Sequence, residues 1–548
     1  MQIDRRGAGA RSSASDSRNH AFWFALIFLV ACSRPGTTHG WGTAHELTIA
    51  RANDPSTLNP LFAFEQADID LTQLYTETLV GLNAKNQPVP LLAERVPTVE
   101  NGDVARDGKT VTYHLRHDVR FADGRPLSSK DVAFTYRAIL DTRNPVTESQ
   151  PYREIERLET PDAYTVVLHF RRPWAGAVGA LFAVTDFVYG ILPAHVFAST
   201  DLTRVPWNDH PFGTGPFRVA RWARGDEIIL EPNPYAWRKP HLQRLIIKIV
   251  PDRNTELLML RTHAADVADY LTNDQVVQPD TRHSVTLVRT EKNHITYAAF
   301  QTRRFPTDDP AVRRAVVEAI DTAQIARNVV HGLWSTATTE IPPVMWAHDP
   351  GVHPYAYDSA RAARDLEAAG WRLVGTTRIK SGRLLIVDVA YESFSQEGRN
   401  EATLIQENVA RVGITATVRG YPSNLFYAEP SGIYYGGRFN LAVTGYYGGS
   451  DPEQSEFFTC DRVAPNGPNT TRLCDPAYDR LFAEQSRLTD RVARGRIFDA
   501  MQRIVAQNAI FVPIVYRGDY SAINPAVHGW APNMLFEFSD ADHWDVVP

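Results

Sequence analysis

The stretch DGKTVTYHLRHDVRFADGRPLSSKDV, residues 107–132, carries two patterns that decide the fold class. Its first part, Thr110–Leu115, has alternating apolar side chains in a β-branched and aromatic run, which predicts a strand. Ser128 and Asp131 then make a capping-box signature, and the apolar residues that follow recur at helical spacing as far as Leu140. A strand that leads into a capped helix predicts a domain in which helices and strands are intermixed.

The same two kinds of element recur on both sides of this stretch. Helices are predicted after Asp309-Pro310, after Asp358, and along an apolar stripe from Ala402 to Val412. Further strands are predicted at residues 46–51, 165–170, 245–250 and 414–418. The sequence therefore predicts a mixed α/β fold.

The N-terminal segment indicates export. An apolar run from Ala21 to Ala31 follows several arginines and is too short to span a bilayer, which is typical of a signal peptide. It ends in Leu-Val-Ala-Cys32, which resembles a bacterial lipoprotein cleavage box. We expect residues 1–32 to be a lipoprotein signal peptide that ends at Cys32, with lipid on that cysteine and a flexible tether over residues 33–44. A plain secretory signal with an incidental cysteine, or a buried helix, is the alternative.

Composition excludes several classes of protein. Of the 548 residues, 43% are hydrophobic and 22% are charged, and the formal net charge is −6. This is ordinary for a soluble globular chain, and about 500 residues after the signal suggest two or three domains. The absence of a basic block argues against nucleic-acid binding. No second apolar run is long enough to cross a membrane, so lipid on Cys32 is the only membrane attachment that we expect.

Two other cysteines remain, Cys460 and Cys474. An exported chain meets an oxidising compartment, so we expect them to form a disulfide, worth roughly 3 kcal/mol in the chain-entropy model. Metal binding is less favoured, because the segment between them contains no histidine and no C-x-x-C spacing.

Residues 107–132, together with several other segments in a fixed order, resemble the peptide/nickel-type extracellular solute-binding proteins of ABC importers (solute-binding family 5). The resemblance spans nearly the whole chain after the signal. The other segments are DPSTLNP (54–60), TLVGLN (78–83), PLLAE (90–94), GTGPF (213–217), NPYAW (233–237), VRRAVVEAID (312–321) and YYGGSDP (446–452).

The resemblance implies a two-lobed clamshell like that of periplasmic binding proteins, with an additional subdomain and a hinge of two crossing segments. Short apolar runs suited to buried strands place the crossings near residues 297–300 and 511–515. One lobe would be discontinuous, built from residues 45–300 plus 511–548, with the extra subdomain at about 75–200. The other lobe would comprise residues 301–510. Closure of the two lobes around a ligand is the implied motion.

Seven residues are candidates for ligand contact. The loops at Asn59 and at Thr214-Gly215 allow close backbone approach, although tight turns without ligand contact would look the same. Tyr446 and Tyr447 lie in a segment rich in Tyr and Gly and suit stacking on a ligand, whereas Tyr434 and Tyr435 are attributed to the core. Asp451 occupies a family position but could simply cap a turn before Pro452. The last candidate is Glu392.

The chain departs from the branch of the family that binds short peptides by their free ends. That branch has an aspartate for the peptide's amino group where this chain has Gly448. It also has an arginine for the carboxylate, and the best-matching position here is Glu392. Because both ionic anchors are missing, a strict dipeptide site is not expected. Longer peptides, a stacked oligosaccharide, or a cationic ligand paired with Glu392 remain open.

The resulting functional hypothesis is a binding protein rather than an enzyme. It would sit outside the cytoplasmic membrane as a monomer, without a cofactor, and pass peptide or another small solute to the membrane subunits of an ABC permease. Metal or haem ligation by His331, His348 and His353 is the weaker interpretation, because solvated or core histidines are far more common. A sensor or chaperone on the same fold is a further alternative. An exported hydrolase is less favoured, because the sequence has no G-x-S-x-G and no H-E-x-x-H.

Overall fold

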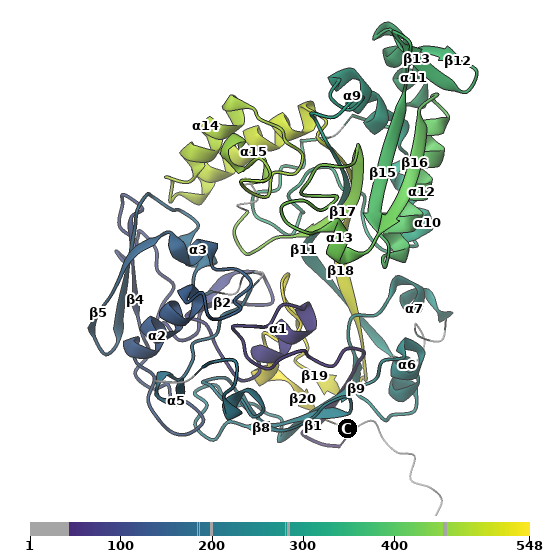
Figure 1. Ribbon diagram of the computed structural model, residues 1–548. Helices are drawn as coiled ribbons and strands as arrows, with labels where there is room; N and C mark the ends of the chain where they lie inside the picture. Colours follow the sequence, from purple (N-terminus) through teal and green to yellow (C-terminus); the bar gives the residue numbers. More distant parts are fainter. Residues whose placement is uncertain are drawn as a thin grey trace, which may run out of the picture. The chain divides into compact units, whose positions relative to one another are not determined.

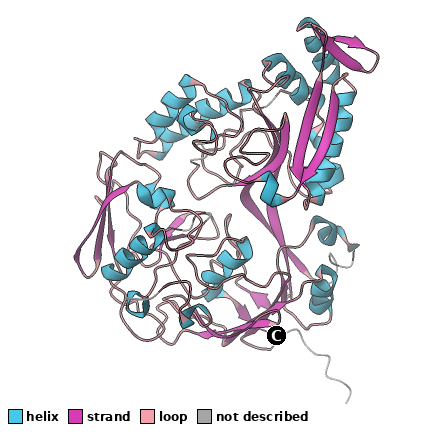
Figure 2. Cartoon of the chain, viewed as in Figure 1, coloured by secondary structure: helices cyan, strands magenta, loops and turns pink. Residues whose placement is uncertain are grey.

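The computed structural model describes residues 43–183, 185, 187–197, 201–279, 281, 285–353, 355–452 and 457–547. The predicted signal peptide and Cys32 lie outside these residues. A mixed sheet of ten strands is the largest element (Figures 1 and 2). Its order is β16 (Thr415–Tyr421), β15 (Ile386–Glu392), β17 (Leu441–Tyr447), β11 (Thr286–Phe300), β18 (Phe511–Ile523), β10 (Val267–Ala268), β1 (Glu46–Arg51), β9 (Arg244–Ile249), β8 (Glu227–Pro232) and β7 (Phe217–Ala223).

Two long strands occupy the middle of this sheet. β11 and β18 run antiparallel, in register from Thr286 opposite Ile523 to Ala299 opposite Phe511, with two irregularities along the way. The apolar runs predicted at residues 297–300 and 511–515 are the ends of these strands and pair with each other. β17, β15 and β16 continue the sheet on one side of the pair, and β10, β1, β9, β8 and β7 continue it on the other.

Helices cover the β15–β17 side of the sheet. α12 (Gln396–Ala410) packs on β15 and β16, and α9 (Pro310–Ala319), α10 (Thr322–Val329) and α11 (Ser359–Ala368) complete this region (Figure 1). Their apolar faces share one core with the sheet, in which Val316, Leu366 and Ile405 are fully buried. The predicted caps are present: Asp309 accepts a hydrogen bond from the amide of Ala311, and Asp358 from that of Arg361. The helix with the 402–412 stripe begins at Gln396, because Ser395 caps it ahead of the stripe.

The β1–β9 side carries smaller elements. α1 (Gln66–Thr72), α6 (Arg253–Arg261) and α7 (Asn273–Val277) belong to this region. β1 is parallel to β9, and its apolar residues Leu47 and Ile49 are fully buried. The C-terminal segment returns here, where Trp544 is buried in the same core and β19 (Val527–His528) pairs with β20 (Asp545–Val546).

The stretch at residues 107–132 builds a separate core. β4 (Thr110–His114) pairs with β6 (Thr165–Phe170), which pairs with β5 (Ile155–Asp162). α2 (Ser129–Leu140) begins with the predicted capping box, in which both hydrogen bonds between Ser128 and Asp131 are formed. Its buried face packs on the sheet in a core that also includes Tyr113 and Phe182. The hairpin of β2 (Val80–Leu82) and β3 (Pro88–Pro90) lies nearby.

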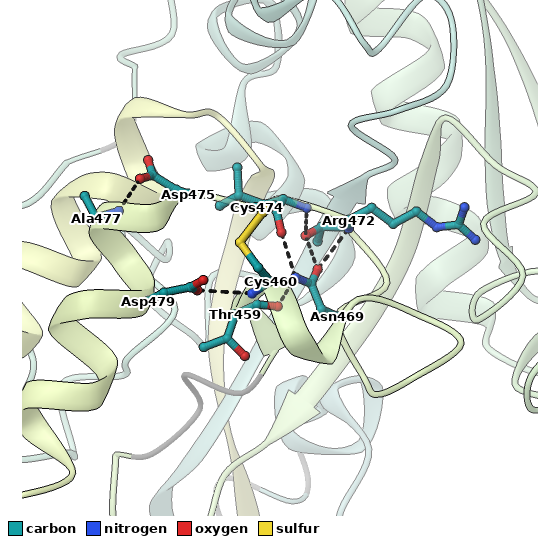
Figure 3. Close-up of a disulfide and its surroundings, with 10 residues drawn as sticks. Thr459, Cys460, Asn469, Arg472, Cys474, Asp475, Ala477 and Asp479 are labelled. Carbon is teal, nitrogen blue, oxygen red and sulfur yellow. Dashed lines mark hydrogen bonds between the residues drawn. A yellow bond between two sulfur atoms is a disulfide. The ribbon is translucent and has the colours of Figure 1, made fainter.

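Two antiparallel helices, α14 (Pro476–Gln485) and α15 (Arg491–Gln507), precede β18. Cys460 and Cys474 form a disulfide immediately before α14 (Figure 3). The remaining elements are short: α3 (Gln150–Arg153), α4 (Ala177–Ala180), α5 (Ala194–Phe197), α13 (Ser423–Phe426), β12 (Arg372–Val374), β13 (Thr377–Lys380), β14 (Arg383–Leu384) and 3-10 turns at Pro206–Asn208, Cys460–Arg462 and Ala541–His543. Among the described residues, no helix combines the length and apolarity needed to cross a membrane.

Candidate ligand pocket beside the central strands

A pocket opens where β11, β17 and β18 lie side by side. It holds about 430 Å³ of space free of protein atoms, part of which is open to solvent. Six of its lining side chains are aromatic, and a single one is a carboxylate. The lining residues are Ile295, Tyr297, Glu340, Tyr434, Tyr446, Phe457, Phe458, Pro468, Thr470, Thr471 and Phe511.

The alternation of side chains along β11 places Ile295 and Tyr297 in the pocket wall. Ile295 and Tyr297 are two apart in β11, so they share a face, and Ile295 is the register partner of Tyr446 in β17. The ring of Tyr446 meets Phe457 edge to face at 4.7 Å. The hydroxyl of Tyr297 lies 3.2 Å from that of Tyr434, which ties the loop after α13 to the central strand.

The loop closed by the disulfide supplies one wall. Pro468, Thr470 and Thr471 lie between Cys460 and Cys474. Asn469 holds the loop from within: its amide nitrogen donates to the carbonyls of Thr459 at 3.0 Å and Leu473 at 2.8 Å (Figure 3). Its side-chain oxygen accepts hydrogen bonds from the hydroxyl of Thr471 and the amide of Arg472, both at 2.9 Å. The wall is therefore fixed by a covalent bond and a local hydrogen-bond network.

Glu340 is the one acidic side chain among the described residues that line the pocket. Only 7% of it is exposed, and its Oε2 atom has no hydrogen-bond partner among the described residues. Burial raises the pKa of Glu340 to about 7, because the charged form is poorly solvated there. The backbone of the residue before it is held by Tyr516 of β18, whose hydroxyl accepts a hydrogen bond from the amide of Thr339 at 2.9 Å. No motif in the sequence singles out Glu340, and lack of a partner is visible only in three dimensions.

The two tyrosines predicted to contact ligand point to opposite faces of β17. Tyr446 lines the pocket, whereas Tyr447, the next residue of β17, points to the opposite face. Tyr447 is 56% exposed, and its ring stacks on His294 with centroids 3.7 Å apart. Tyr434, which the sequence analysis attributed to the core, does pack there, stacked on Phe426 and Phe439, and it also lines the pocket.

The predicted residues of the N-terminal half do not line this pocket. Asn59 is fully buried, and its amide nitrogen donates to Asn208 at 3.0 Å while its side-chain oxygen accepts from the amide of Leu61 at 3.0 Å. Thr214 is buried, and its hydroxyl has no partner among the described residues. Gly215 donates its amide to the carbonyl of Tyr75 at 3.1 Å.

Glu392 and Asp451 also lie outside the pocket lining. Glu392 ends β15 and accepts a hydrogen bond from the hydroxyl of Ser423. Asp451 forms a two-pronged ion pair with Arg494 of α15, with both nitrogen–oxygen distances at 2.8 Å. Arg494 is only 6% exposed, so this pair fastens the segment after β17 to α15. Their ligand roles remain predictions.

Gly215 has a packing role that can be tested. A Cβ atom at this position would lie 2.7 Å from the backbone carbon of Tyr75, which cannot move aside as a flexible side chain could. We expect Gly215→Ala to lower the free energy of unfolding by roughly 1–3 kcal/mol. The matched control is Gly495→Ala in α15, where the nearest heavy atom is 3.8 Å away and helix propensity favours alanine by up to about 1 kcal/mol. Urea unfolding of both variants measures the difference, and equal effects would refute the packing role.

The three histidines considered for metal or haem do not come together. His331 contacts Asp274 at 2.7 Å, and His348 contacts the carbonyl of Ile341 at 2.7 Å. Within the described residues, no group of three or more His, Cys, Asp or Glu side chains is placed to hold a metal ion.

Comparison with known proteins assigns the chain to a protein family. The sequence model described as "bacterial extracellular solute-binding proteins, family 5 Middle" matches residues 87–465. A relative from Escherichia coli, the probable D,D-dipeptide-binding periplasmic protein DdpA, is 23% identical over 531 residues, which cover 95% of this chain and 98% of that protein.

Solved structures share the fold. The oligopeptide-binding protein AppA from Bacillus subtilis, solved with a nonapeptide, superposes with a TM-score of 0.74 at 19% sequence identity. The match covers 93% of this chain and 100% of the AppA chain. NikA from Brucella suis, solved with Fe(III)-EDTA, gives a TM-score of 0.78 at 20% identity, covering 92% and 100%. The predicted fold class, mixed α/β as in two-lobed periplasmic binding proteins, is thereby confirmed.

Proposed function

The chain belongs to the bacterial extracellular solute-binding proteins of family 5, and from this premise we propose that it is the substrate-binding component of an ABC importer. It captures peptides or a related solute outside the cytoplasmic membrane and delivers them to a permease. The observation that carries this proposal is the pocket beside the central strands, where aromatic rings, two threonines and one buried carboxylate converge. Such a mixture of apolar walls and a few fixed polar groups is typical of sites for small ligands.

We place the two lobes on either side of the central strands. Residues 45–300 plus 511–548 form one lobe, with residues 75–200 as its extra subdomain, and residues 301–510 form the other. β11 and β18 are then the hinge segments. Several hydrogen bonds join the proposed lobes away from the hinge. In two of them, Ala175 donates its amide to the carbonyl of Ser486 at 3.0 Å, and the hydroxyl of Ser450 donates to the carbonyl of Gly179 at 3.0 Å. Opening and closing of the lobes would break and make these contacts.

The segment around Gly448 supports a ligand other than a dipeptide held by its ends. A Cβ atom at Gly448 would lie 2.3 Å from the side-chain nitrogen of Asn293, so the aspartate of the dipeptide-binding branch would fit here only if the Asn293 side chain moved. The amide of Gly448 and the carbonyl of Gly449 are both bonded to Asn293, at 2.8 Å each. The local packing thus gives the amino end of a peptide no anchor at this position.

For the cell envelope, we propose that lipid on Cys32 anchors a monomeric protein and that membrane permease subunits are its partners. Support comes from the cleavage-box sequence before Cys32 and from the periplasmic relative. Mass analysis of the mature protein tests the anchor: a diacylglyceryl adduct on an N-terminal Cys32 is expected, and cleavage at another residue without lipid would contradict it.

Native mass spectrometry tests the proposed function. The protein is purified from its expression host and measured before and after mild unfolding and refolding. We expect a co-purifying mass, or a ladder of peptide masses, that leaves on unfolding. A protein that arrives empty and whose melting temperature no peptide raises would overturn the peptide proposal, because a ligand that binds only the folded state must stabilise it.

Tyr446 and Tyr447 give a matched pair of variants for locating the ligand. Tyr446→Ala removes an aromatic wall of the pocket and should weaken binding of the released solute by about tenfold. Tyr447→Ala changes the neighbouring residue, whose exposed ring faces away, and should change the affinity by less than about twofold. Calorimetric titration measures both, and a larger effect of Tyr447→Ala would move the site to the other face of β17.

A further inference from the structure

The charge of the pocket has a single source. Among the described lining residues, Glu340 is the sole charged side chain, and none is a lysine, arginine or histidine. The nearby phenol of Tyr478 stays neutral, because burial, and then the negative charge of Glu340, raise its pKa well above the usual value. A ligand group that enters this pocket therefore meets a carboxylate that no cation of the described lining neutralises.

Some other buried carboxylates of this chain are paired with cations, and others, such as Asp266, accept hydrogen bonds from neighbouring amides. Asp269 accepts a hydrogen bond from the guanidinium of Arg51 at 2.9 Å, and Glu537 lies 3.1 Å from the ammonium of Lys292. Leaving a buried carboxylate without a partner is unfavourable, since desolvation is not offset by an opposite charge. The Oε2 atom of Glu340 has neither kind of partner among the described residues, and a cavity gives a ligand access to it. This indicates that its partner comes from outside the chain.

The walls suit the same kind of partner. Tyr297, Tyr434, Tyr446 and Phe511 line the pocket with aromatic rings. A cation placed over such faces is attracted by the ring quadrupole, and desolvation strengthens this attraction. A carboxylate within an aromatic enclosure is therefore complementary to an ammonium or guanidinium group and repels a ligand carboxylate.

We propose that this pocket is a subsite for a cationic nitrogen group of the ligand, with Glu340 as its counter-ion and the surrounding rings as its walls. The group is either the α-ammonium of a peptide or the side chain of a basic residue. This inference rests on the proposed function and names the ligand chemistry of its site. It replaces the anchor that Gly448 cannot provide, and it assigns to Glu340 the role that the sequence suggested for Glu392.

Calorimetric titration of the full-length protein at pH 8 separates the two sources of charge. The probes are Ala-Ala-Ala, N-acetyl-Ala-Ala-Ala, N-acetyl-Ala-Lys-Ala and N-acetyl-Ala-norleucine-Ala. A cationic probe should bind about tenfold or more tightly than its neutral counterpart. A preference for Ala-Ala-Ala over its N-acetyl form identifies the α-ammonium as the bound group. A preference for the lysine probe over the norleucine probe identifies a basic side chain. In Glu340→Gln the preference should fall to within about twofold, and Glu340→Asp should retain part of it.

Equal binding of neutral and cationic probes, with loss of both in Glu340→Gln, would overturn the proposal, because Glu340 would then act as a neutral hydrogen-bond donor. A cation preference that survives Glu340→Gln would also overturn it.

Thermal unfolding with tetramethylammonium chloride, compared with sodium chloride at equal ionic strength, covers the case in which no peptide binds. Stabilisation of the wild type alone supports the subsite while the peptide proposal fails. With no peptide bound and no stabilisation by tetramethylammonium, the subsite fails as well.

Discussion

Glu340→Gln is expected to raise the free energy of unfolding of the ligand-free protein by about 3 kcal/mol at pH 8. Burial raises the pKa of Glu340 from an ordinary value of 4.5 to about 7, so its charged form is unfavourable in the folded state. Glutamine keeps nearly the same shape without ionising, so the variant loses the penalty. The same substitution should abolish preference for a cationic ligand, which makes Glu340 a residue that lowers stability in favour of binding.

The pH dependence of this effect has a definite sign. Below about pH 4.5 the carboxyl is protonated in both folded and unfolded chains, and the wild type and variant should be nearly equal. Between about pH 4.5 and 7 the folded wild type holds a proton that the unfolded chain has released, so its stability falls as pH rises. Above about pH 7 the full difference is reached.

Urea unfolding at several pH values, followed by tryptophan fluorescence, measures the difference. The control is Glu484→Gln, an exposed glutamate of α14, which should stay within about 0.5 kcal/mol of the wild type. If Glu340→Gln were destabilising, or its effect independent of pH, the buried unpaired carboxylate would be refuted.

Lys292→Met is the second variant with a large expected effect, in the opposite direction. Lys292 of β11 is 3% exposed, and its ammonium lies 3.1 Å from Glu537 and 3.6 Å from Asp519 of β18. It also donates to the carbonyl of Asn533 at 3.1 Å. Methionine fills similar space but removes the cation beside the buried Glu537 and the half-buried Asp519, so the free energy of unfolding should fall by about 3–5 kcal/mol.

Two further variants separate charge from packing at this site. Lys380→Met removes a lysine that is 40% exposed and 3.3 Å from Asp309, and should cost less than about 1 kcal/mol. Adding Glu537→Gln to Lys292→Met removes the carboxylate charge that has lost its lysine, and should recover part of the lost free energy of unfolding. Equal losses in Lys292→Met and Lys380→Met, measured by urea unfolding, would show that the buried network does not hold the central strands together.

The fold follows from local patterns wherever those patterns are complete within a short stretch. The capping box of Ser128 and Asp131 and the caps at Asp309 and Asp358 are written in a few neighbouring residues, and all appear as predicted. The central strands were predicted only at their apolar ends. Their polar halves, with the buried Lys292, need partners such as Glu537 that lie far away in the sequence. Periodicity within one segment cannot supply that information.

The candidate site, too, could be predicted from the sequence only in part. Aromatic composition drew attention to Tyr446 and Tyr447, but only the register of β17 against β11 decides which of them faces the pocket. Tyr434 was attributed to the core, where it packs on Phe426, but its place in the pocket depends on the loop that brings it to Tyr297. Glu340 was not predicted at all. What distinguishes it is burial without a counter-charge, and that is a property of the packed structure alone.

The most direct test of the central claim, that a solute binds in the pocket beside the central strands, is one calorimetric experiment. Refolded ligand-free wild type and Tyr446→Ala are titrated with the solute that the native protein releases. We predict one site per chain in the wild type and about tenfold weaker binding in Tyr446→Ala. A released solute that binds both proteins equally, or a refolded wild type that does not rebind it, would contradict the account.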